Sequence, residues 1–270
     1  MTADDASLTA DALRALAPRA AAVWHIEVCD STCSTSSDLL ERRDAGNCVR
    51  FALEQTAGRG RRGRDWIARP RDSLTFSLRV RFAGPVDRLS GLSLAVGVIL
   101  ADALAGAGFA GLALKWPNDL MQRSGPAGSQ EGGKLGGVLI ELASAATHTD
   151  AVIGIGVNLA PPPVVCALTP ASLFEATPPR SEWLRVAAAL LEGLAVGLPV
   201  FSQQGFAAFA GRWNQINLHA GCHVEVIGEP SRTAGVCVGA DVDGALMLDG
   251  GDRIERILAG DVSLRQRGPD

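Results

Sequence analysis

The chain has 270 residues, 47% of them hydrophobic, and carries a formal net charge of −4 at pH 7. A chain of this length and composition can bury one large core, or a large core and a small one. The acidic balance argues against a protein made chiefly to coat nucleic acid, because such proteins carry a basic domain or a basic face.

The most apolar stretch of the chain, residues 92–114, is interrupted by Asp102 and, near its end, by Gly106, Gly108 and Gly111. We therefore expect a buried helix followed by a loop and a strand, and not a membrane span. Asp4 and Asp5 lie where a secretory signal has its basic region, which predicts a cytoplasmic protein. The six cysteines form no CxxC pair, so free thiols are expected.

Capping signals and hydrophobic periodicity predict two helices and two strands in the first fifth of the chain. The first helix is expected over residues 7–24, with Ser7 or Thr9 as its N-cap and Pro18 near its end. The elements that follow are a strand at 24–30, a helix at 35–46 closed by Gly46, and a strand at 48–55.

The middle of the chain predicts a central sheet flanked by helices. Residues 73–82 alternate as a half-buried strand does, and a long helix is expected from about 89 to 105. Three short runs rich in Val, Ile and Leu suit neighbouring strands of one sheet, at 112–116, 134–142 and 151–159. Residues 121–133 are a loop by composition, and two further helices are expected at 181–198 and 205–213.

Past Asn217 the pattern changes to short strands separated by Gly and Asp turns. These strands are expected at 222–228, 233–241, 244–250 and 253–265. The sequence therefore predicts a small β-barrel appended to an α/β domain.

The stretch "EQTAGRGRRGRDW" places four arginines and three glycines in the seven residues from Gly58 to Arg64. Glycines let backbone N–H groups approach an anion closely, and each guanidinium offers paired donors to a phosphate or a carboxylate. The loop is therefore predicted to clamp an anionic small molecule. A solvated basic loop or a nucleic-acid patch is the alternative interpretation.

A metal site near the C-terminal strands is one interpretation of His219, Cys222 and His223, which fall within five residues and are followed by Cys237. Zinc spacing usually repeats as paired knuckles, and only one knuckle is present here. We expect a strand start in which alternate residues face inward, and no metal ligand is assigned to the protein.

Four blocks, "GRGRRGR", "KWPNDL", "KLGGVLIE" and "GIGVNL", resemble in this order the signature blocks of bacterial biotin protein ligases. The resemblance runs from Val28 to the C-terminus, and lipoate ligases share the fold but lack the first two blocks. It implies an α+β fold: a catalytic domain like that of class II aminoacyl-tRNA synthetases, with a mixed central sheet, at residues 1–217. It also implies an SH3-like β-barrel at residues 218–270.

The implied reaction has two steps. Biotin and ATP, with Mg²⁺ carried by the nucleotide, give biotinyl-adenylate and pyrophosphate. A lysine of a biotin carboxyl carrier domain, typically of acetyl-CoA carboxylase, then attacks the adenylate. A lipoate or octanoate ligase or transferase of the same fold is the alternative function.

Some members of this family also repress genes through an N-terminal winged helix-turn-helix. About one short helix precedes the first predicted strand here, whereas such a module needs several helices with a basic recognition face. We therefore expect a ligase that lacks the DNA-binding domain, with no DNA and no membrane partner. A homodimer formed by pairing sheet edges is possible.

The chemistry of the first step needs cations, because a carboxylate must approach a polyanionic triphosphate. The residues that can supply them are Arg59, Arg61, Arg64 and Lys134. A buried ureido group needs an acceptor for each N–H and donors for its oxygen. Mg²⁺ commonly binds phosphates, water and few protein groups.

The resemblance assigns roles to individual residues. The catalytic residues would be Arg61, Lys134 and Asp119, with Asp119 orienting the incoming lysine. Biotin would contact Ser34, Thr35, Gln55, Gly58, Arg59, Arg61, Lys134, Gly136, Gly137 and Gly154, while Gly156 would let the sheet edge pass beneath the ligand. ATP would contact Arg59, Arg61, Arg64, Trp66, Asn118, Lys134 and Asn158, with Trp66 stacked on adenine.

The chain departs from the family pattern at two places. Ser36 stands where the family usually has the asparagine of an STN triplet, and Ser31 and Thr32 offer a second serine-threonine pair just upstream. The linker between the KWPNDL block and Lys134 is also longer. Ser34 and Thr35 are in addition ordinary N-cap residues, and Trp66 could be a core residue.

Overall fold

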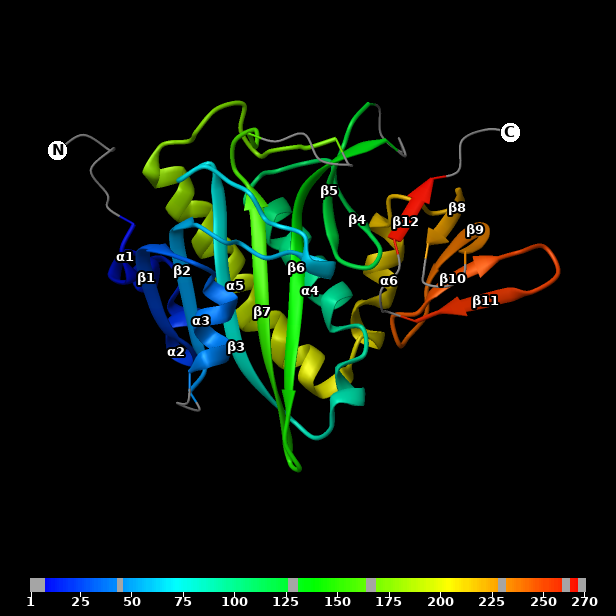
Figure 1. Ribbon diagram of the computed structural model, residues 1–270, viewed down its shortest axis with the longest axis horizontal. Coiled ribbons are helices and arrows are strands. Elements are labelled where there is room, and N and C mark those ends of the chain that lie inside the picture. The colour runs from blue at the N-terminus through cyan, green and yellow to red at the C-terminus, as the bar shows by residue number, and fades with distance from the viewer. Residues whose placement is uncertain are drawn as a thin grey trace.

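The computed structural model describes residues 8–42, 46–125, 131–163, 169–227 and 232–258, together with the backbone of strand 263–266. Two sheets lie side by side, a large one in the middle and a small one at the C-terminal end (Figure 1). Asp4, Asp5, Ser7 and Cys166 fall outside the described residues. The five cysteines within them are free thiols, as expected.

The large sheet has seven strands in the order β1-β2-β3-β7-β6-β5-β4. Strand β1 runs parallel to β2, and every other neighbouring pair is antiparallel, so the sheet is mixed as predicted. The strands are β1 (His25–Thr32), β2 (Cys48–Gln55), β3 (Ser73–Ala83), β4 (Leu112–Lys115), β5 (Asp119–Arg123), β6 (Gly132–Ser144) and β7 (His148–Asn158).

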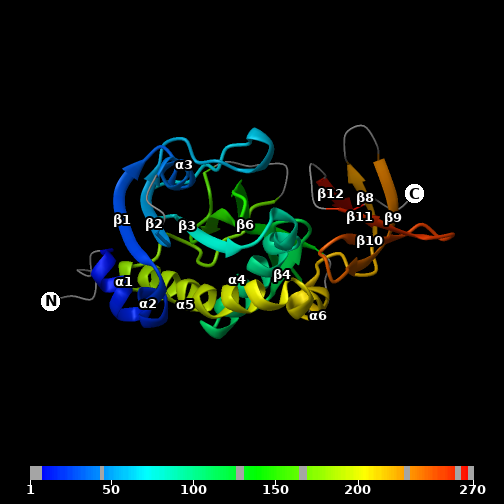
Figure 2. The ribbon, with the colours of Figure 1, turned by 90° about the horizontal axis from the view of Figure 1, so that it is seen from below.

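Most of the helices cover one face of this sheet, and the opposite face carries α3 and the arginine loop (Figure 2). The covering helices are α1 (Ala10–Leu16), α2 (Pro18–Val23), α4 (Leu92–Gly106), α5 (Arg180–Gln204) and α6 (Ala207–Ile216). The short helix α3 (Thr35–Glu41) packs on β2, β3 and β7. Two single 3₁₀ turns, Arg61–Gly63 and Val86–Leu89, complete the helical segments that are described.

The core forms between the sheet and the covering helices. Phe51 and Phe76 stack on neighbouring strands with ring centroids 4.6 Å apart, and Trp183 of α5 lies against Phe51. By length and composition, residues 86–106 and α5 are apolar enough to cross a membrane, with 61% and 50% of their apolar windows buried inside the fold. Both pack in this core, which agrees with the expectation of a buried helix.

The small sheet has five antiparallel strands in the order β11-β10-β9-β8-β12. They are β8 (His223–Ile227), β9 (Arg232–Ala240), β10 (Leu246–Asp249), β11 (Ile254–Ile257) and β12 (Ser263–Gln266). The sheet joins the rest of the molecule closely: Trp116 Nε1 donates to the Gly244 carbonyl at 3.1 Å, and Ser90 Oγ to the Asp243 carbonyl at 2.8 Å.

The structure corrects the predicted helix ends near the N-terminus. Pro18 does not lie near the end of one helix but opens a second, because proline has no N–H to donate and suits the first turn. Thr9 is the N-cap of α1. Helix α3 ends at Glu41 and not at Gly46, since Arg42 leaves the helix to pair with Glu27 while Arg79 donates to its carbonyl.

Three strand predictions were also wrong in detail. Strand β5 occupies residues 119–123, so the predicted loop at 121–133 begins later, and β4 is separated from β6. Strand β3 is buried on both faces over most of its length, because α3 packs against it on one side of the sheet and α5 on the other (Figure 2). The predicted strand at 253–265 is two strands, β11 and β12, at opposite edges of the small sheet.

Candidate active site

A cavity of about 940 Å³ lies on the sheet face that carries α3 and the arginine loop. It crosses the large sheet from α3, β2 and β3 on one side to β4 and β5 on the other. All the predicted site residues except Gly58 and Gly136 line it. Segments far apart in the sequence are therefore brought to one site by the sheet order.

One end of the cavity is a cluster of buried hydroxyl groups. The Thr35 backbone N–H donates to Gln55 Oε1 at 2.8 Å, and Thr35 Oγ1 lies 2.7 Å from Ser77 Oγ. Ser36 Oγ is 2.9 Å from the same Ser77 hydroxyl, and Ser34 caps α3 by accepting from the Ser37 N–H. This end offers several acceptors and donors in a small dry space, as a compact polar head group requires.

The alternative pair, Ser31 and Thr32, does not line this cavity. Ser31 is exposed, and the Thr32 hydroxyl is bonded to the Asp38 carboxylate at 2.8 Å. Asp38 also accepts from Arg50 Nε at 2.6 Å. These contacts hold α3 on the β1–β2 edge, so Thr32 helps to position the helix whose N-terminus faces the cavity.

The arginine loop folds into a tight turn over the cavity. Gly60 N–H donates to the Arg64 carbonyl at 2.7 Å, and Trp66 N–H to the Gly58 carbonyl at 2.8 Å. Arg59 pairs with Glu141 on β6 at 2.6 Å, whereas Arg61 donates to Asn118 Oδ1 at 3.4 Å. The loop thus reaches across the cavity to the opposite strands.

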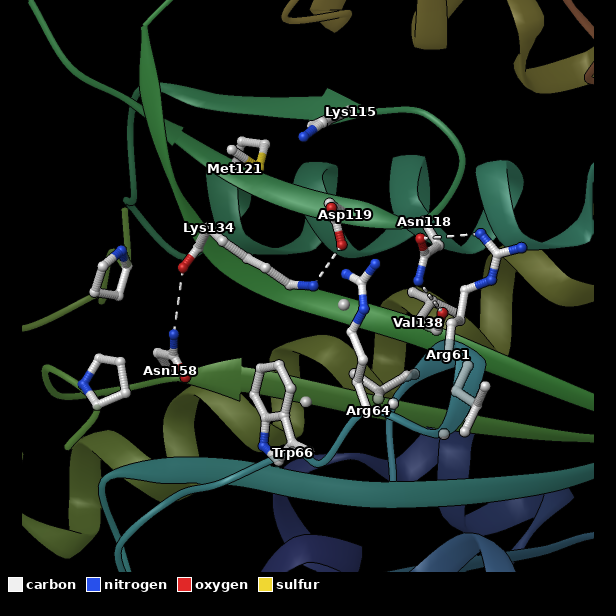
Figure 3. Close-up of a pocket in the computed structure, with 18 of the residues that line it drawn as sticks. Arg61, Arg64, Trp66, Lys115, Asn118, Asp119, Met121, Lys134, Val138 and Asn158 are labelled. Atoms are coloured by element: carbon white, nitrogen blue, oxygen red, sulfur yellow. Dashed lines mark hydrogen bonds and ion pairs between the residues drawn. The ribbon is translucent and has the colours of Figure 1, made fainter. Parts of the chain in front are cut away.

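The centre of the cavity holds an ion pair between Lys134 Nζ and Asp119 Oδ1 at 2.6 Å (Figure 3). Their side chains are 25% and 12% exposed. Figure 3 shows the Arg64 guanidinium reaching toward this centre from the loop side, whereas Arg61 extends toward Asn118. Two cations, Lys134 and Arg64, therefore lie near one carboxylate, which leaves an excess of positive charge where an anion could bind.

Asn118 and Asn158 use their amide N–H groups to hold the chain in place. Asn118 Nδ2 donates to the Val138 carbonyl at 2.9 Å, and Asn158 Nδ2 to the carbonyls of Lys134 at 3.3 Å and Ala171 at 3.0 Å (Figure 3). Both side chains line the cavity, so they fix its wall around Lys134.

Two glycines of β7 make room for the cavity walls. A Cβ atom at Gly156 would lie 2.5 Å from the Trp66 ring, and one at Gly154 would lie 2.6 Å from Ser36 Oγ. The indole of Trp66 therefore lies directly on the sheet. At the neighbouring strand, a Cβ at Gly136 would meet the Gly156 carbonyl at 2.5 Å, which explains a glycine outside the cavity.

A sequence profile of the biotin/lipoate A/B protein ligase family matches residues 26–158. The biotin–acetyl-CoA-carboxylase ligase of Mycobacterium tuberculosis is 33% identical over 249 residues, which cover 88% of this chain and 88% of that protein. The chain belongs to the biotin protein ligase family. The bifunctional ligase/repressor BirA of Escherichia coli is 31% identical over 250 residues, covering 86% of this chain and 71% of that protein.

Solved structures of the family share this fold. A biotin protein ligase from Aquifex aeolicus in complex with biotin and ATP superposes with a TM-score of 0.71 at 26% identity. The match covers 90% of this chain and 99% of that chain. The mixed central sheet is thus the family's fold, as the resemblance implied.

The other end of the cavity was not predicted to be part of the site. Lys115 on β4, Arg123 on β5 and His219 after α6 line it together with Met121. Lys115 opens the KWPNDL block and could have been chosen from it. His219 lies in none of the sequence blocks, and its spacing to Cys222 and His223 suggests only a metal ligand. The described residues contain no group of three or more His, Cys, Asp or Glu that could hold a metal.

Proposed function

We propose that the protein is a biotin protein ligase, which joins biotin to ATP and passes the biotinyl group to a lysine of a carrier domain. One observation carries this proposal: a single cavity connects a buried hydroxyl cluster at Thr35 and Ser77 to the cations at Arg61 and Lys134. A small acid whose polar head fits the first end would present its carboxylate to the second.

In the first step, a biotin carboxylate oxygen attacks the α-phosphorus of ATP, the bond from that phosphorus to the bridging oxygen breaks, and pyrophosphate leaves. The protein contributes mainly position and charge. Lys134 and Arg61 would offset the repulsion between the carboxylate and the phosphates. Thr35 and Gln55 would hold the ureido ring so that the carboxylate points at the cations.

In the second step, the amine of a carrier lysine attacks the acyl carbon and AMP leaves. Asp119 is our candidate for orienting that amine, because its carboxylate lies at the centre of the cavity beside Lys134. The partner is a biotin carboxyl carrier domain, and the curated relative from M. tuberculosis is named for acetyl-CoA carboxylase.

Mg²⁺ is inferred to enter with the nucleotide. Hard oxygen ligands suit this ion, and triphosphate oxygens and water supply them with little help from the protein. The carboxylate nearest the cations, Asp119, is already paired with Lys134 at 2.6 Å. Phosphate oxygens would therefore supply most of its ligands, and the ion would reduce the negative charge that the cavity must balance.

We further infer a catalytic domain at residues 1–217 and an SH3-like domain at 218–270. The change from α6 to the small antiparallel sheet supports this boundary, and the four antiparallel pairings among its five strands are consistent with such a barrel. We also propose that the enzyme acts in the cytoplasm and that its edge strand β1 allows a homodimer.

Pyrophosphate release from ATP tests the proposed function. Release should require biotin and should not occur with lipoate or octanoate in its place. A Thr35→Val variant keeps the side-chain shape but removes the hydroxyl, so it should raise the KM for biotin and leave the KM for ATP unchanged. Faster release with lipoate than with biotin would contradict the proposal, as would equal effects of Thr35→Val on both substrates.

A further inference from the structure

The cavity has two ends of different chemistry on opposite sides of the large sheet. Thr35 and Ser77 lie at the β2–β3 side, whereas Lys115 and Arg123 lie on β4 and β5, at the other side in the strand order. The Lys134–Asp119 pair stands between them on β6 and β5. A ligand that enters the hydroxyl end and reaches the centre therefore leaves the β4 end for another group.

His219 is a buried imidazole at this far end. It is 5% exposed, and its Nδ1 has no hydrogen-bond partner among the described residues, although it lines the cavity. Its backbone is fixed, because its N–H donates to Asn217 Oδ1 at 3.1 Å and its carbonyl accepts from the Cys222 N–H at 3.0 Å. This Nδ1 atom is itself enclosed by the protein, so it is an unsatisfied buried polar atom, and the ring meets the cavity through its other atoms.

The charges around His219 define what ligand this end of the cavity can take. Burial and the nearby charges of Lys115 and Arg123 lower the pKa of His219 to about 4, so the ring is neutral. The thiols on the following turn and strand, Cys222 and Cys237, are neutral as well, because burial raises the pKa of each. Glu131 is the acidic group that lines the same end of the cavity.

Lys115 and Arg123, whose Nη2 also donates to the Asn217 carbonyl at 3.2 Å, place two positive charges beside a neutral imidazole, which suits an anion with several charges. A phosphate group accepts hydrogen bonds from ammonium, guanidinium and imidazole groups alike. Its charge would also reverse the local field, so that the charged form of the imidazole becomes the favoured one.

The geometry of phosphoryl transfer says which phosphates reach this end. The attacking and leaving oxygens lie roughly in line on opposite sides of the reacting phosphorus. If the carboxylate approaches from the β2–β3 side and the phosphorus lies near Lys134, the leaving group departs toward β4. Lys115, Arg123 and His219 lie there.

We propose that Lys115, Arg123 and His219 form the subsite that receives pyrophosphate, and that His219 takes up a proton when the polyphosphate binds. This inference rests on the proposed function for the direction of departure, whereas the anion site itself rests on the contacts above. The proton comes from solvent and returns to solvent when pyrophosphate leaves. Pyrophosphate binding should therefore weaken as pH rises, in addition to any effect of its own ionisation.

Calorimetry with pyrophosphate and Mg²⁺ tests this proposal on the intact protein. Titrations in two buffers of different ionisation enthalpy give the number of protons taken up on binding. The variants are His219→Gln and, as a matched control, His223→Gln, which alters an exposed histidine outside the cavity. Subtracting the proton uptake of a variant from that of the wild type removes the contribution of pyrophosphate's own ionisation, which is the same for both proteins.

At about pH 6 the wild type should take up roughly half a proton or more beyond His219→Gln, since a ring with a pKa near 4 when free would return to its ordinary range when bound. Binding should also weaken about ten-fold in His219→Gln at that pH. At about pH 8 both differences should shrink. His223→Gln should match the wild type.

Equal affinity and equal proton uptake in the wild type and His219→Gln would overturn the proposal, and so would a wild type that does not bind pyrophosphate. Biotin affinity reports whether His219→Gln has folded, because biotin is assigned to the other end. If that variant does not fold, Lys115→Met serves: it removes one of the cations that keep His219 neutral, so it should weaken pyrophosphate binding and reduce proton uptake. Unchanged values would again overturn the proposal.

The two claims can fail separately. If the protein binds pyrophosphate with the expected proton uptake, but releases no pyrophosphate from ATP in the presence of biotin, the anion site stands and the proposed function is wrong. If the protein releases pyrophosphate in the presence of biotin, but pyrophosphate binds equally well to the wild type and to His219→Gln, the proposed function stands and the proposed pyrophosphate subsite is wrong.

Discussion

Replacing Lys134 by Met separates the catalytic role of this lysine from its role in the fold. Lys134 Nζ lies 2.6 Å from Asp119 Oδ1, and the two side chains are 25% and 12% exposed. Removing the ammonium leaves a largely buried carboxylate without its ion pair. Because this pair is only partly buried, we expect the single variant to lose about 1–3 kcal/mol of unfolding free energy, less than a fully buried pair would cost.

The double variant Lys134→Met with Asp119→Asn removes both charges. Replacing both members of a pair by neutral groups is often close to neutral, so its stability should return to within about 1 kcal/mol of the parent. Activity should not return, since the cation that offsets the phosphate charge is still missing. By analogy with the loss of one transition-state donor, pyrophosphate release should fall about 100- to 1000-fold in both variants.

Urea unfolding measures the stability of each variant, and biotin-dependent pyrophosphate release measures its catalytic rate. The two should separate in the double variant, with stability restored and catalysis still lost. Recovery of the parent rate in the double variant would refute the reasoning, because it would mean that Lys134 acts only by neutralising Asp119.

Three further outcomes are expected. Arg61→Gly removes a charge-assisted contact worth roughly 1.5–3 kcal/mol, so biotinyl-adenylate should dissociate about ten- to a hundred-fold faster and label lysines of an unrelated protein. If the variant still forms the adenylate but labels that protein no more than the parent does, Arg61 is not the group that holds the adenylate in the site. The Gly58–Arg64 loop should resist protease better with biotin and ATP than without them, because a bound anion would add contacts to several of its arginines at once. Equal cleavage with and without the ligands would contradict this. Hydrogen bonds from Arg81, and then from Arg79, lower the pKa of Asp150 from 3.8 to about 2 against the opposing effect of burial. This carboxylate should therefore stabilise the fold above about pH 4 and lose that contribution as pH falls toward 2. In urea unfolding, Asp150→Asn should lower the unfolding free energy by roughly 1–2 kcal/mol at pH 7 and by about half as much at pH 3. A difference in unfolding free energy between parent and variant that does not change with pH would contradict the lowered pKa of Asp150.

The strands that could be predicted are those whose pattern is local. Strand β2 was predicted with its observed ends, Cys48 and Gln55, because apolar residues fill it between two loops. Strand β5 was missed, since its Asp119, Gln122 and Arg123 look like loop residues and its partners β4 and β6 supply the pairing. Helix α3 ended early for a similar reason, because contacts from other strands draw Arg42 away.

The residues of the candidate site also fall into two groups, those that the local sequence predicts and those that only the packing brings to the cavity. Residues inside contiguous blocks, such as Arg61 and Lys134, were predicted and do line one cavity. Ser77 was not, because on β3 it looks like any polar residue of an alternating strand, and only the packing of α3 brings Thr35 within 2.7 Å of it. His219 lies between α6 and β8, and it reaches the cavity because the chain there runs beside β4, where the Leu218 N–H donates to the Leu114 carbonyl at 2.8 Å.

The most direct test of the central claim is the mass of a biotin carboxyl carrier domain after incubation with the protein, ATP, Mg²⁺ and biotin. We expect one biotinyl group per carrier domain, none when the acceptor lysine is replaced by arginine, and none when lipoate replaces biotin. An unmodified carrier under these conditions, or a carrier that gains a lipoyl group more readily than a biotinyl group, would contradict the claim that this cavity joins biotin to ATP.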